Sequence, residues 1–128
     1  MIVLGPPKFS SFAIALGILL VLDGIWLTSA FKMNWYPAAA KTRMHIAFGG
    51  GLAWAALALG HSMVRPKTWG ESVVFGSVFG FIVYAVYNGT DYAIQQNWTG
   101  QIAARDLVWG TFASTVTAII VYACVHAK

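Results

Sequence analysis

The fold is decided by residues 76–110, which read GSVFGFIVYAVYNGTDYAIQQNWTGQIAARDLVWG. The stretch opens as an apolar segment in which Gly76 and Gly80 lie four residues apart. It then becomes polar, with four side chains that can carry charge or donate hydrogen bonds: Asn88, Asp91, Arg105 and Asp106. After these the chain is apolar again. We interpret the stretch as two membrane-spanning helices whose polar residues lie near one membrane face.

The composition of the whole chain is typical of a membrane protein. Of its 128 residues, 59% are hydrophobic and 9% are charged, whereas soluble domains carry about 25% charged residues. This length allows one domain, residues 1–128. The net charge of +4 comes from eight Lys and Arg residues scattered singly, while a nucleic-acid binder would cluster them on one face. We therefore expect the lipid bilayer as a partner, and no nucleic acid.

Four apolar segments are long enough to span a bilayer, which takes about 20 residues. We predict helices over residues 9–31, 44–64, 71–88 and 107–125. The polar stretch 90–104 predicts a structured loop at the membrane interface, although the third helix could continue to Gln95 and Thr99 could already cap the fourth helix. Asn34 to Pro37 is typical of a cap with a proline in the first turn of the second helix. The predicted fold class is an all-α integral membrane protein, a bundle of four transmembrane helices.

An even number of spans predicts that both termini lie on the same side of the membrane. The Lys and Arg residues are then divided equally between the two sides, so the positive-inside rule leaves the orientation undecided. Four lie on the side of the termini (Lys8, Arg65, Lys67, Lys128) and four on the opposite side (Lys32, Lys41, Arg43, Arg105).

Small residues follow one face of three of the predicted helices. Such stripes let membrane helices approach closely. They comprise Gly49, Ala53, Ala56 and Gly60 in the second helix, Gly76 and Gly80 in the third, and Gly110, Ala113 and Thr117 in the fourth. We expect them to pack the bundle from inside; a seam between two copies of the chain is the alternative.

Asp23 is the one charged residue inside the first apolar segment. It follows Phe9 by 14 residues, or roughly 21 Å of helix, which puts it close to the membrane face where the third helix ends. Asp106 would lie at a similar depth if the fourth helix begins at Thr99. We therefore expect Asp23, Asn88, Asp91, Arg105 and Asp106 to converge in one polar site.

Buried acids need partners, because an isolated charge in hydrocarbon costs at least a few kcal/mol. The candidate cations are Arg105, Arg43, Lys41 and His45. Two Asp-x-x-Trp patterns place Trp26 and Trp109 on the same helix faces as Asp23 and Asp106. We expect these two tryptophans, with His45 and Tyr84, to surround the site. The site is either a hydrogen-bond network that tethers the helices or a binding site for a proton, a cation or a lipid headgroup.

The sequence lacks the motifs of the common catalytic and metal centres. It contains no HExxH, CxxC, GxSxG or phosphate loop. His61 and His126 approach the same membrane face and could ligate a haem, but histidines near helix ends usually lie at the interface. We therefore predict no catalytic residue, no metal and no cofactor.

Five motifs occur in order along nearly the whole chain: Leu22-Asp23-x-x-Trp26-Leu27, Gly76-x-x-x-Gly80-Phe81, Tyr84-x-x-Tyr87-Asn88-x-Thr90-Asp91, Trp98 and Asp106-x-x-Trp109-Gly110. Together they resemble the uncharacterised four-helix membrane-protein family catalogued as domain of unknown function 2177. The resemblance implies a four-helix membrane protein of this length and no particular activity. Where the family would have Tyr-Asp-x-Thr-Asn, this chain exchanges the acid and the amide, with Asn88 and Asp91.

These observations favour a polytopic membrane protein without a catalytic centre, acting as a structural or accessory subunit beside other membrane subunits or in a homo-oligomer. The alternative is a small proton-coupled transporter or channel that uses Asp23 and Asp106. A third hypothesis is lipid or pigment binding between the helices, which six Trp and five Tyr residues would favour.

Overall fold

The computed structural model describes residues 2–37 and 42–127. Its helices are α1 (Phe9–Lys32), α2 (Arg43–Met63), α3 (Trp69–Ile94) and α4 (Gly100–Val121), and α4 continues as the π-helix η1 (Tyr122–His126). Each of the four is long and apolar enough to cross a membrane. The predicted fold class, four membrane-spanning helices, is confirmed.

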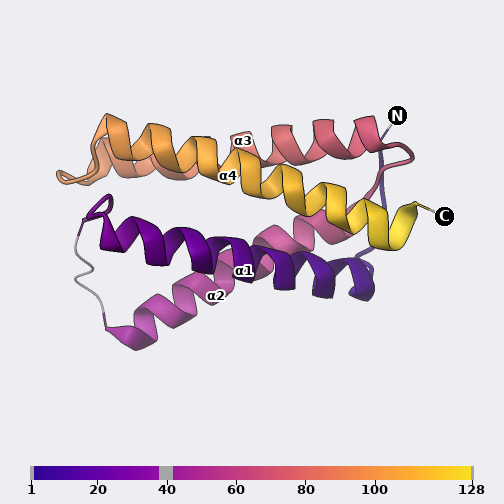
Figure 1. The fold of residues 1–128 in the computed structure, drawn as a ribbon, viewed down its shortest axis with the longest axis horizontal. Helices are drawn as coiled ribbons and strands as arrows, with labels where there is room; N and C mark the ends of the chain where they lie inside the picture. Colours follow the sequence, from indigo (N-terminus) through magenta and orange to yellow (C-terminus); the bar gives the residue numbers. More distant parts are fainter. Residues whose placement is uncertain (1, 38–41, 128) are drawn as a thin grey trace.

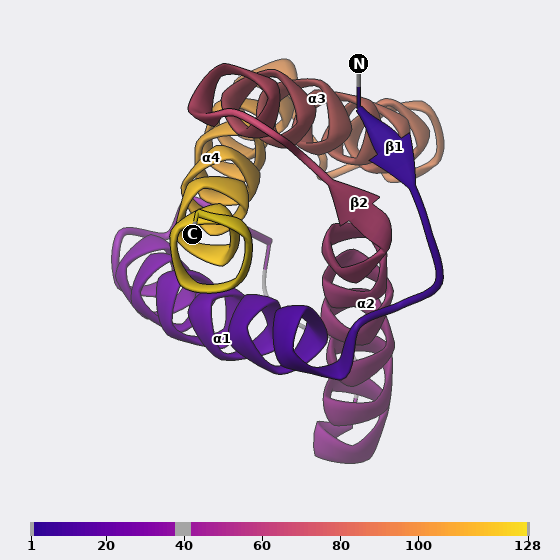
Figure 2. The ribbon, with the colours of Figure 1, turned by 90° about the vertical axis from the view of Figure 1, so that its right-hand side faces the viewer.

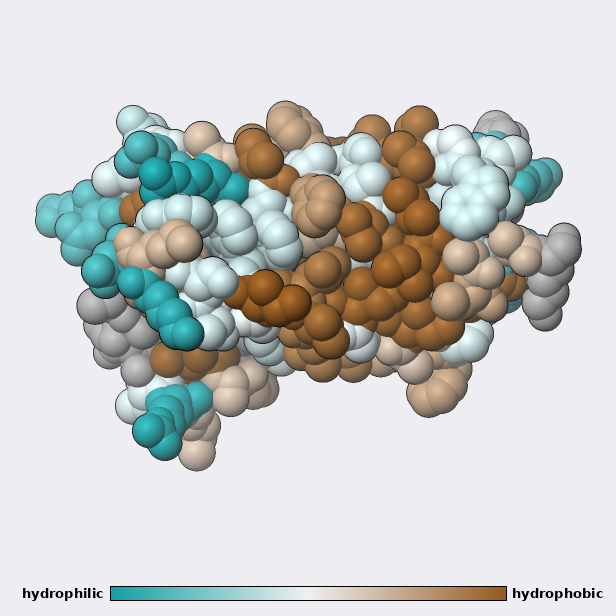
Figure 3. All heavy atoms as spheres, viewed as in Figure 1, coloured by the Kyte–Doolittle hydropathy of each residue, from teal (hydrophilic) through white to brown (hydrophobic). Residues whose placement is uncertain are grey.

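The helices form a ring when the molecule is viewed along its length (Figure 2), in the order α3, α4, α1 and α2. The most extensive contact joins α3 to α4; α1 contacts both α2 and α4. Both termini lie at one end of the molecule (Figure 1). We call this the terminal end, and the opposite end, with the α1–α2 and α3–α4 connections, the connection end. Hydrophobic residues dominate the middle of the surface, and hydrophilic ones gather mostly at the connection end (Figure 3).

A short β-ladder, which the sequence did not predict, ties the terminal end together. β1 (Val3–Leu4) pairs antiparallel with β2 (Val64–Arg65). The ladder continues as hydrogen bonds from the Gly5 and Lys8 amides to the carbonyls of residues 63 and 62, at 2.8 and 3.1 Å. The Arg65 guanidinium also donates to the Pro6 carbonyl. These bonds fix the segment before α1 against the end of α2.

The predicted interfacial loop over residues 90–104 is wrong. α3 continues beyond residue 88 to Ile94, and α4 begins at Gly100 rather than 107. Polar side chains did not end the helix, because Asn88 and Asp91 lie three residues apart on its buried face. Thr99 caps α4, and its hydroxyl accepts a hydrogen bond from the Ile102 amide at 3.2 Å. The two alternatives, a third helix that continues to Gln95 and a fourth that begins at Thr99, are therefore the correct ones.

The segment 34–37 does not cap the second helix, as the sequence had suggested. Thr42 caps α2. Asn34 instead adopts a left-handed conformation, with φ 54°, and ends α1. The Asn34 amide donates to the Phe31 carbonyl and the Trp35 amide to the Ala30 carbonyl, at 3.2 and 2.9 Å. This is the Schellman pattern of a helix C-terminus, and after it the side chains of residues 35 and 36 contact the bundle. Residues 38–41 lie outside the described part of the chain.

Glycines allow α3 and α4 to pack closely. A Cβ atom at Gly76 would lie 2.7 Å from the Thr115 Cα atom, and one at Gly80 would lie 2.9 Å from the Gly110 carbonyl oxygen. Gly110 faces the Tyr84 ring in the same contact. The sequence-based stripes on these two helices therefore lie where they were expected.

The stripe on α2 is correct only at Gly60, which lies against the Phe79 ring. Gly49, Ala53 and Ala56 are exposed, and a Cβ atom at Gly49 would meet nothing within 4 Å. Their predicted packing inside the bundle is wrong, because α2 diverges from the other helices toward the connection end (Figure 1).

Candidate functional site

Asp23 of α1 is buried, with 7% of its surface exposed, and accepts two hydrogen bonds from indole groups. Trp54 of α2 donates through Nε1 to Oδ2 at 2.7 Å. Trp109 of α4 donates through Nε1 to Oδ1 at 2.9 Å. Each carboxylate oxygen thus has its own donor, and the acid joins three helices.

Asp106 of α4 is buried to the same extent and is bonded in the same manner. The Tyr36 hydroxyl, from the α1–α2 connection, donates to Oδ1 at 2.5 Å. The Asn88 side-chain amide, from α3, donates to Oδ2 at 2.7 Å. Again both oxygens are occupied by neutral donors from other elements.

Two further tryptophans orient these donors. Trp26 donates through Nε1 to the Tyr36 hydroxyl at 2.7 Å, and Trp98 through Nε1 to the Asn88 side-chain oxygen at 3.1 Å. We refer to the whole set as the carboxylate network: Asp23, Trp26, Tyr36, Trp54, Asn88, Trp98, Asp106 and Trp109.

The two Asp-x-x-Trp patterns exchange their partners. Trp109 follows Asp106 but bonds to Asp23. Trp26 follows Asp23 but supports the tyrosine that bonds to Asp106. The two indoles stack with ring centroids 4.7 Å apart and planes 4° from parallel. The antiparallel helices α1 and α4 are therefore joined by a reciprocal contact of acids and rings.

The predicted cation partners are not bonded to these acids. Within the described residues, neither Asp23 nor Asp106 forms an ion pair. Arg105 lies over the Trp35 ring, 4.7 Å from its centroid, because consecutive helical residues point about 100° apart. His45 is exposed and lies beside the Thr42 hydroxyl, 2.6 Å away, on the diverging part of α2, where Arg43 is exposed too. Lys41 lies outside the described residues.

Asp91 lies near the network but has a different partner. Its Oδ1 atom accepts a hydrogen bond from the Gln95 side chain, one turn along α3, at 2.6 Å. Its Oδ2 atom is buried and has no hydrogen-bond partner in the described part of the chain. Asn88 and Asp91 therefore have distinct roles in this chain. Tyr84 accepts from the Asn88 amide through its backbone carbonyl at 2.9 Å.

A family model described as a predicted membrane protein, DUF2177, matches residues 8–123. The chain belongs to this family. The match covers all four helices and the complete carboxylate network, and it confirms the resemblance drawn from the sequence motifs. No curated protein and no solved structure matches the chain.

Sequence reasoning missed three donors of the network in this DUF2177 member: Tyr36, Trp54 and Trp98. A signal for Trp54 was present. An indole N–H in an apolar span needs an acceptor, and Trp54 lies 11 residues from the start of α2 while Asp23 lies 9 residues from the end of α1. The two positions are therefore at similar depth.

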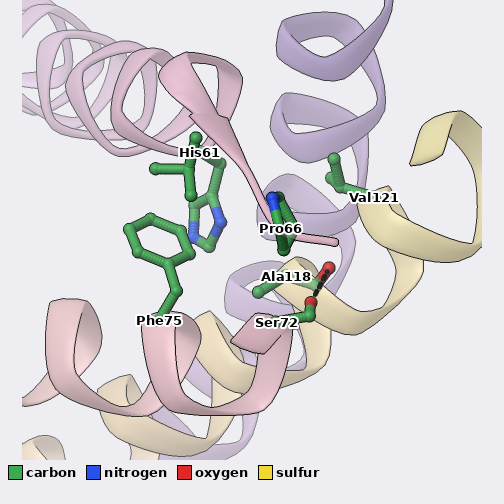
Figure 4. A pocket seen from close by; sticks show the side chains of 7 residues that line it. His61, Pro66, Ser72, Phe75, Ala118 and Val121 are labelled. Carbon is green, nitrogen blue, oxygen red and sulfur yellow. Dashed lines mark hydrogen bonds between the residues drawn. The ribbon is translucent and has the colours of Figure 1, made fainter. Parts of the chain in front are cut away.

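His61 belongs to a separate contact at the terminal end. It is 2% exposed, and its Nε2 atom lies 3.2 Å from the Ser114 hydroxyl. Its ring stands edge-on to Phe75 and Phe79. Figure 4 shows His61 beside Phe75 in the lining of a small pocket. The cavity there has a volume of about 10 Å³, the lower limit of what one water molecule needs. Among the described residues, no three His, Cys, Asp or Glu side chains are grouped as a metal site.

The pKa of the Tyr36 phenol is raised above its usual range, first by burial and then by the hydrogen bond to Asp106. The folded protein therefore keeps a proton that the unfolded chain loses above about pH 10. Stability contributed by Tyr36 is complete below that pH and is lost as the pH rises further. We expect the free energy of unfolding in detergent to fall by about 1 kcal/mol per pH unit above about pH 10, and to fall less in Tyr36→Phe.

The matched control is Tyr92→Phe, which removes a hydroxyl from a tyrosine that is 62% exposed. This variant should follow the alkaline profile of the unmodified protein. Identical profiles for Tyr36→Phe and the unmodified protein would show that Tyr36 does not hold its proton through the network.

Proposed function

We propose that this DUF2177 protein is a structural or accessory subunit in the membrane, without a catalytic centre of its own. The proposal rests on one observation, that donors of the protein itself bond to the buried carboxylates. All four oxygens of Asp23 and Asp106 accept N–H or O–H groups of the protein itself. An acid bonded in this way holds the helices together, because each of its oxygens accepts a hydrogen bond from another element of the bundle.

The energetics favour a tether. A buried donor that loses its acceptor costs about 1–3 kcal/mol, and the bilayer core offers no water as a substitute. The network contains four bonds to carboxylates and two bonds that orient their donors. It connects α1, α2, α3, α4 and the α1–α2 connection, so no helix can leave the bundle without breaking part of it.

The proposal includes fixed neighbours in the membrane, either other subunits or a second copy. It is supported by the exposed small residues of α2, since Gly49 and Ala53 allow another helix to approach closely. We expect the protein to copurify with its neighbours in constant ratio when membranes are solubilised in a mild detergent. Isolation as a lone monomer under these conditions would count strongly against the proposal.

A matched pair of variants refines this experiment. Gly49→Leu and Gly24→Leu each add the same side chain where a Cβ atom meets nothing within 4 Å, the first on the α2 stripe and the second on α1. Loss of copurification in Gly49→Leu alone would locate the contact on α2. If both variants still copurify with their neighbours to the same extent, the α2 stripe is not the contact surface.

The alternative is a small proton-coupled transporter or channel. One observation favours it: within the described residues, the three buried acids Asp23, Asp91 and Asp106 lack a cation partner, and Asp91 Oδ2 is buried without a hydrogen-bond partner. Four short helices enclose little pathway, so the path would lie at an interface between copies. The transporter hypothesis predicts a pH-dependent flux in proteoliposomes, and Asp23→Asn should abolish that flux. Flux no greater than in protein-free liposomes would exclude it.

A further inference from the structure

An open groove of about 500 Å³ lies along α4 beside the end of α1. Its wall is a continuous row of aromatic rings. The centroid of Trp26 lies 5.5 Å from that of Trp35 and 4.7 Å from that of Trp109, which in turn lies 5.7 Å from Phe112. Trp26 and Trp109 are also held by hydrogen bonds of the carboxylate network, so this aromatic wall is rigid.

Arg105 is the one charged side chain among the described residues that line this groove. Its guanidinium lies over the Trp35 ring, a cation–π contact that orients the group without neutralising it. No carboxylate of the described residues pairs with it, and the neighbouring Asp106 is bonded to Tyr36 and Asn88 on the inner side of α4. The guanidinium thus keeps donors suited to the oxygens of a phosphate group.

The charge and the apolar wall lie at different depths. Arg105 is the sixth residue of α4 counted from the connection end, which places it roughly 8 Å along the helix. Phe112 lies seven residues further, roughly 10 Å deeper. Val108 and Phe112 are 70% and 54% exposed, so the deeper part of the groove presents apolar surface to the bilayer. A positive group near the helix end with apolar surface below it matches a phospholipid standing in its leaflet.

We infer that this groove binds an anionic phospholipid, with its phosphate at Arg105 and the upper part of an acyl chain along Trp109 and Phe112. The inference rests on the charge and depth of the groove and does not depend on the proposed function. It assigns to Arg105 a ligand outside the protein, in place of the carboxylate partner that the sequence suggested.

The test uses the full chain in phosphatidylcholine vesicles and its own tryptophan fluorescence, since three of the six tryptophans line the groove. Brominated phosphatidylglycerol and brominated phosphatidylcholine are added in turn, and quenching gives their relative affinity. We expect phosphatidylglycerol to bind about five-fold more tightly, as for one arginine at an anionic headgroup. Equal quenching by the two lipids would overturn the inference, and this comparison requires no variant.

Variants then locate the preference. Arg105→Gln should reduce the ratio of the two affinities to about one. Arg105→Lys should retain only part of the preference, because the charge remains but the planar guanidinium stacked on Trp35 is lost. The control is Arg43→Gln, which removes an exposed arginine at the same end of the molecule but outside the groove. It should leave the preference unchanged. A preference that survives Arg105→Gln, or that Arg43→Gln removes equally, would contradict the assignment to Arg105.

Discussion

Asp23→Ala is expected to lower the free energy of unfolding in detergent by about 2–4 kcal/mol, because two buried donors lose their acceptor at once. The Nε1 groups of Trp54 and Trp109 bond to separate oxygens of this acid, and α2 has little other contact with α4. Asp23→Asn should cost about half as much, since the amide keeps one acceptor oxygen but turns an N–H group toward the second indole. Reversible unfolding in mixed micelles measures both changes.

Asp91→Ala is the matched control for this result. Asp91 is 8% exposed, close to the burial of Asp23, but its hydrogen-bond partner in the described structure is Gln95 on its own helix. We expect a loss below about 1 kcal/mol. If Asp23→Ala and Asp91→Ala cost the same, burial of an acid rather than bonding between helices would explain the effect.

Gly76→Ala is the second change with a large expected effect. Its added methyl group would lie 2.7 Å from the Thr115 Cα atom and 2.8 Å from the Ser114 carbonyl oxygen, so the backbones of α3 and α4 must separate. Overpacking of this kind costs about 1–3 kcal/mol or more. We expect a loss of about 3 kcal/mol and a weaker hydrogen bond from the Ser72 hydroxyl to the Ala118 carbonyl across the same contact.

Gly89→Ala provides the comparison in the same helix. A Cβ atom there meets nothing within 4 Å, and alanine favours the helix by up to about 1 kcal/mol relative to glycine. This variant should be as stable as the unmodified protein or slightly more stable. Equal losses in Gly76→Ala and Gly89→Ala would mean that the α3–α4 contact is not limited by steric fit.

The four spans could be predicted because the length of an apolar segment is a direct requirement of the bilayer. The ends of α1 and α2 were predicted to within one residue. The main predicted bounds of α3 and α4 at the connection end were too short, because polar residues such as Asn88 and Asp91 can continue a helix when they lie on its buried face. The small residues of α3 and α4 were assigned correctly. Those of α2 were not, since sequence spacing defines a face but not whether a neighbour covers it.

The sequence predicted which residues lie at the site better than it predicted their hydrogen-bond partners. Asp23, Asn88 and Asp106 do meet in the bundle, but a cation was expected where the protein uses indole, phenol and amide donors. Tyr36 could not be foreseen, because its position depends on the left-handed turn at Asn34. Arg105 was expected to face the acids, whereas its place on the helix directs it toward the lipid-facing groove.

A double-mutant cycle between Asp23→Ala and Trp54→Phe tests the central claim, that the carboxylates tether the helices. Trp54→Phe keeps an aromatic ring and removes the N–H group that bonds to Asp23. If the bond joins α1 to α2 as described, the two losses in unfolding free energy will be less than additive, with a coupling of about 1–3 kcal/mol. Strictly additive losses would contradict the account, because they would show that the two residues stabilise the protein independently.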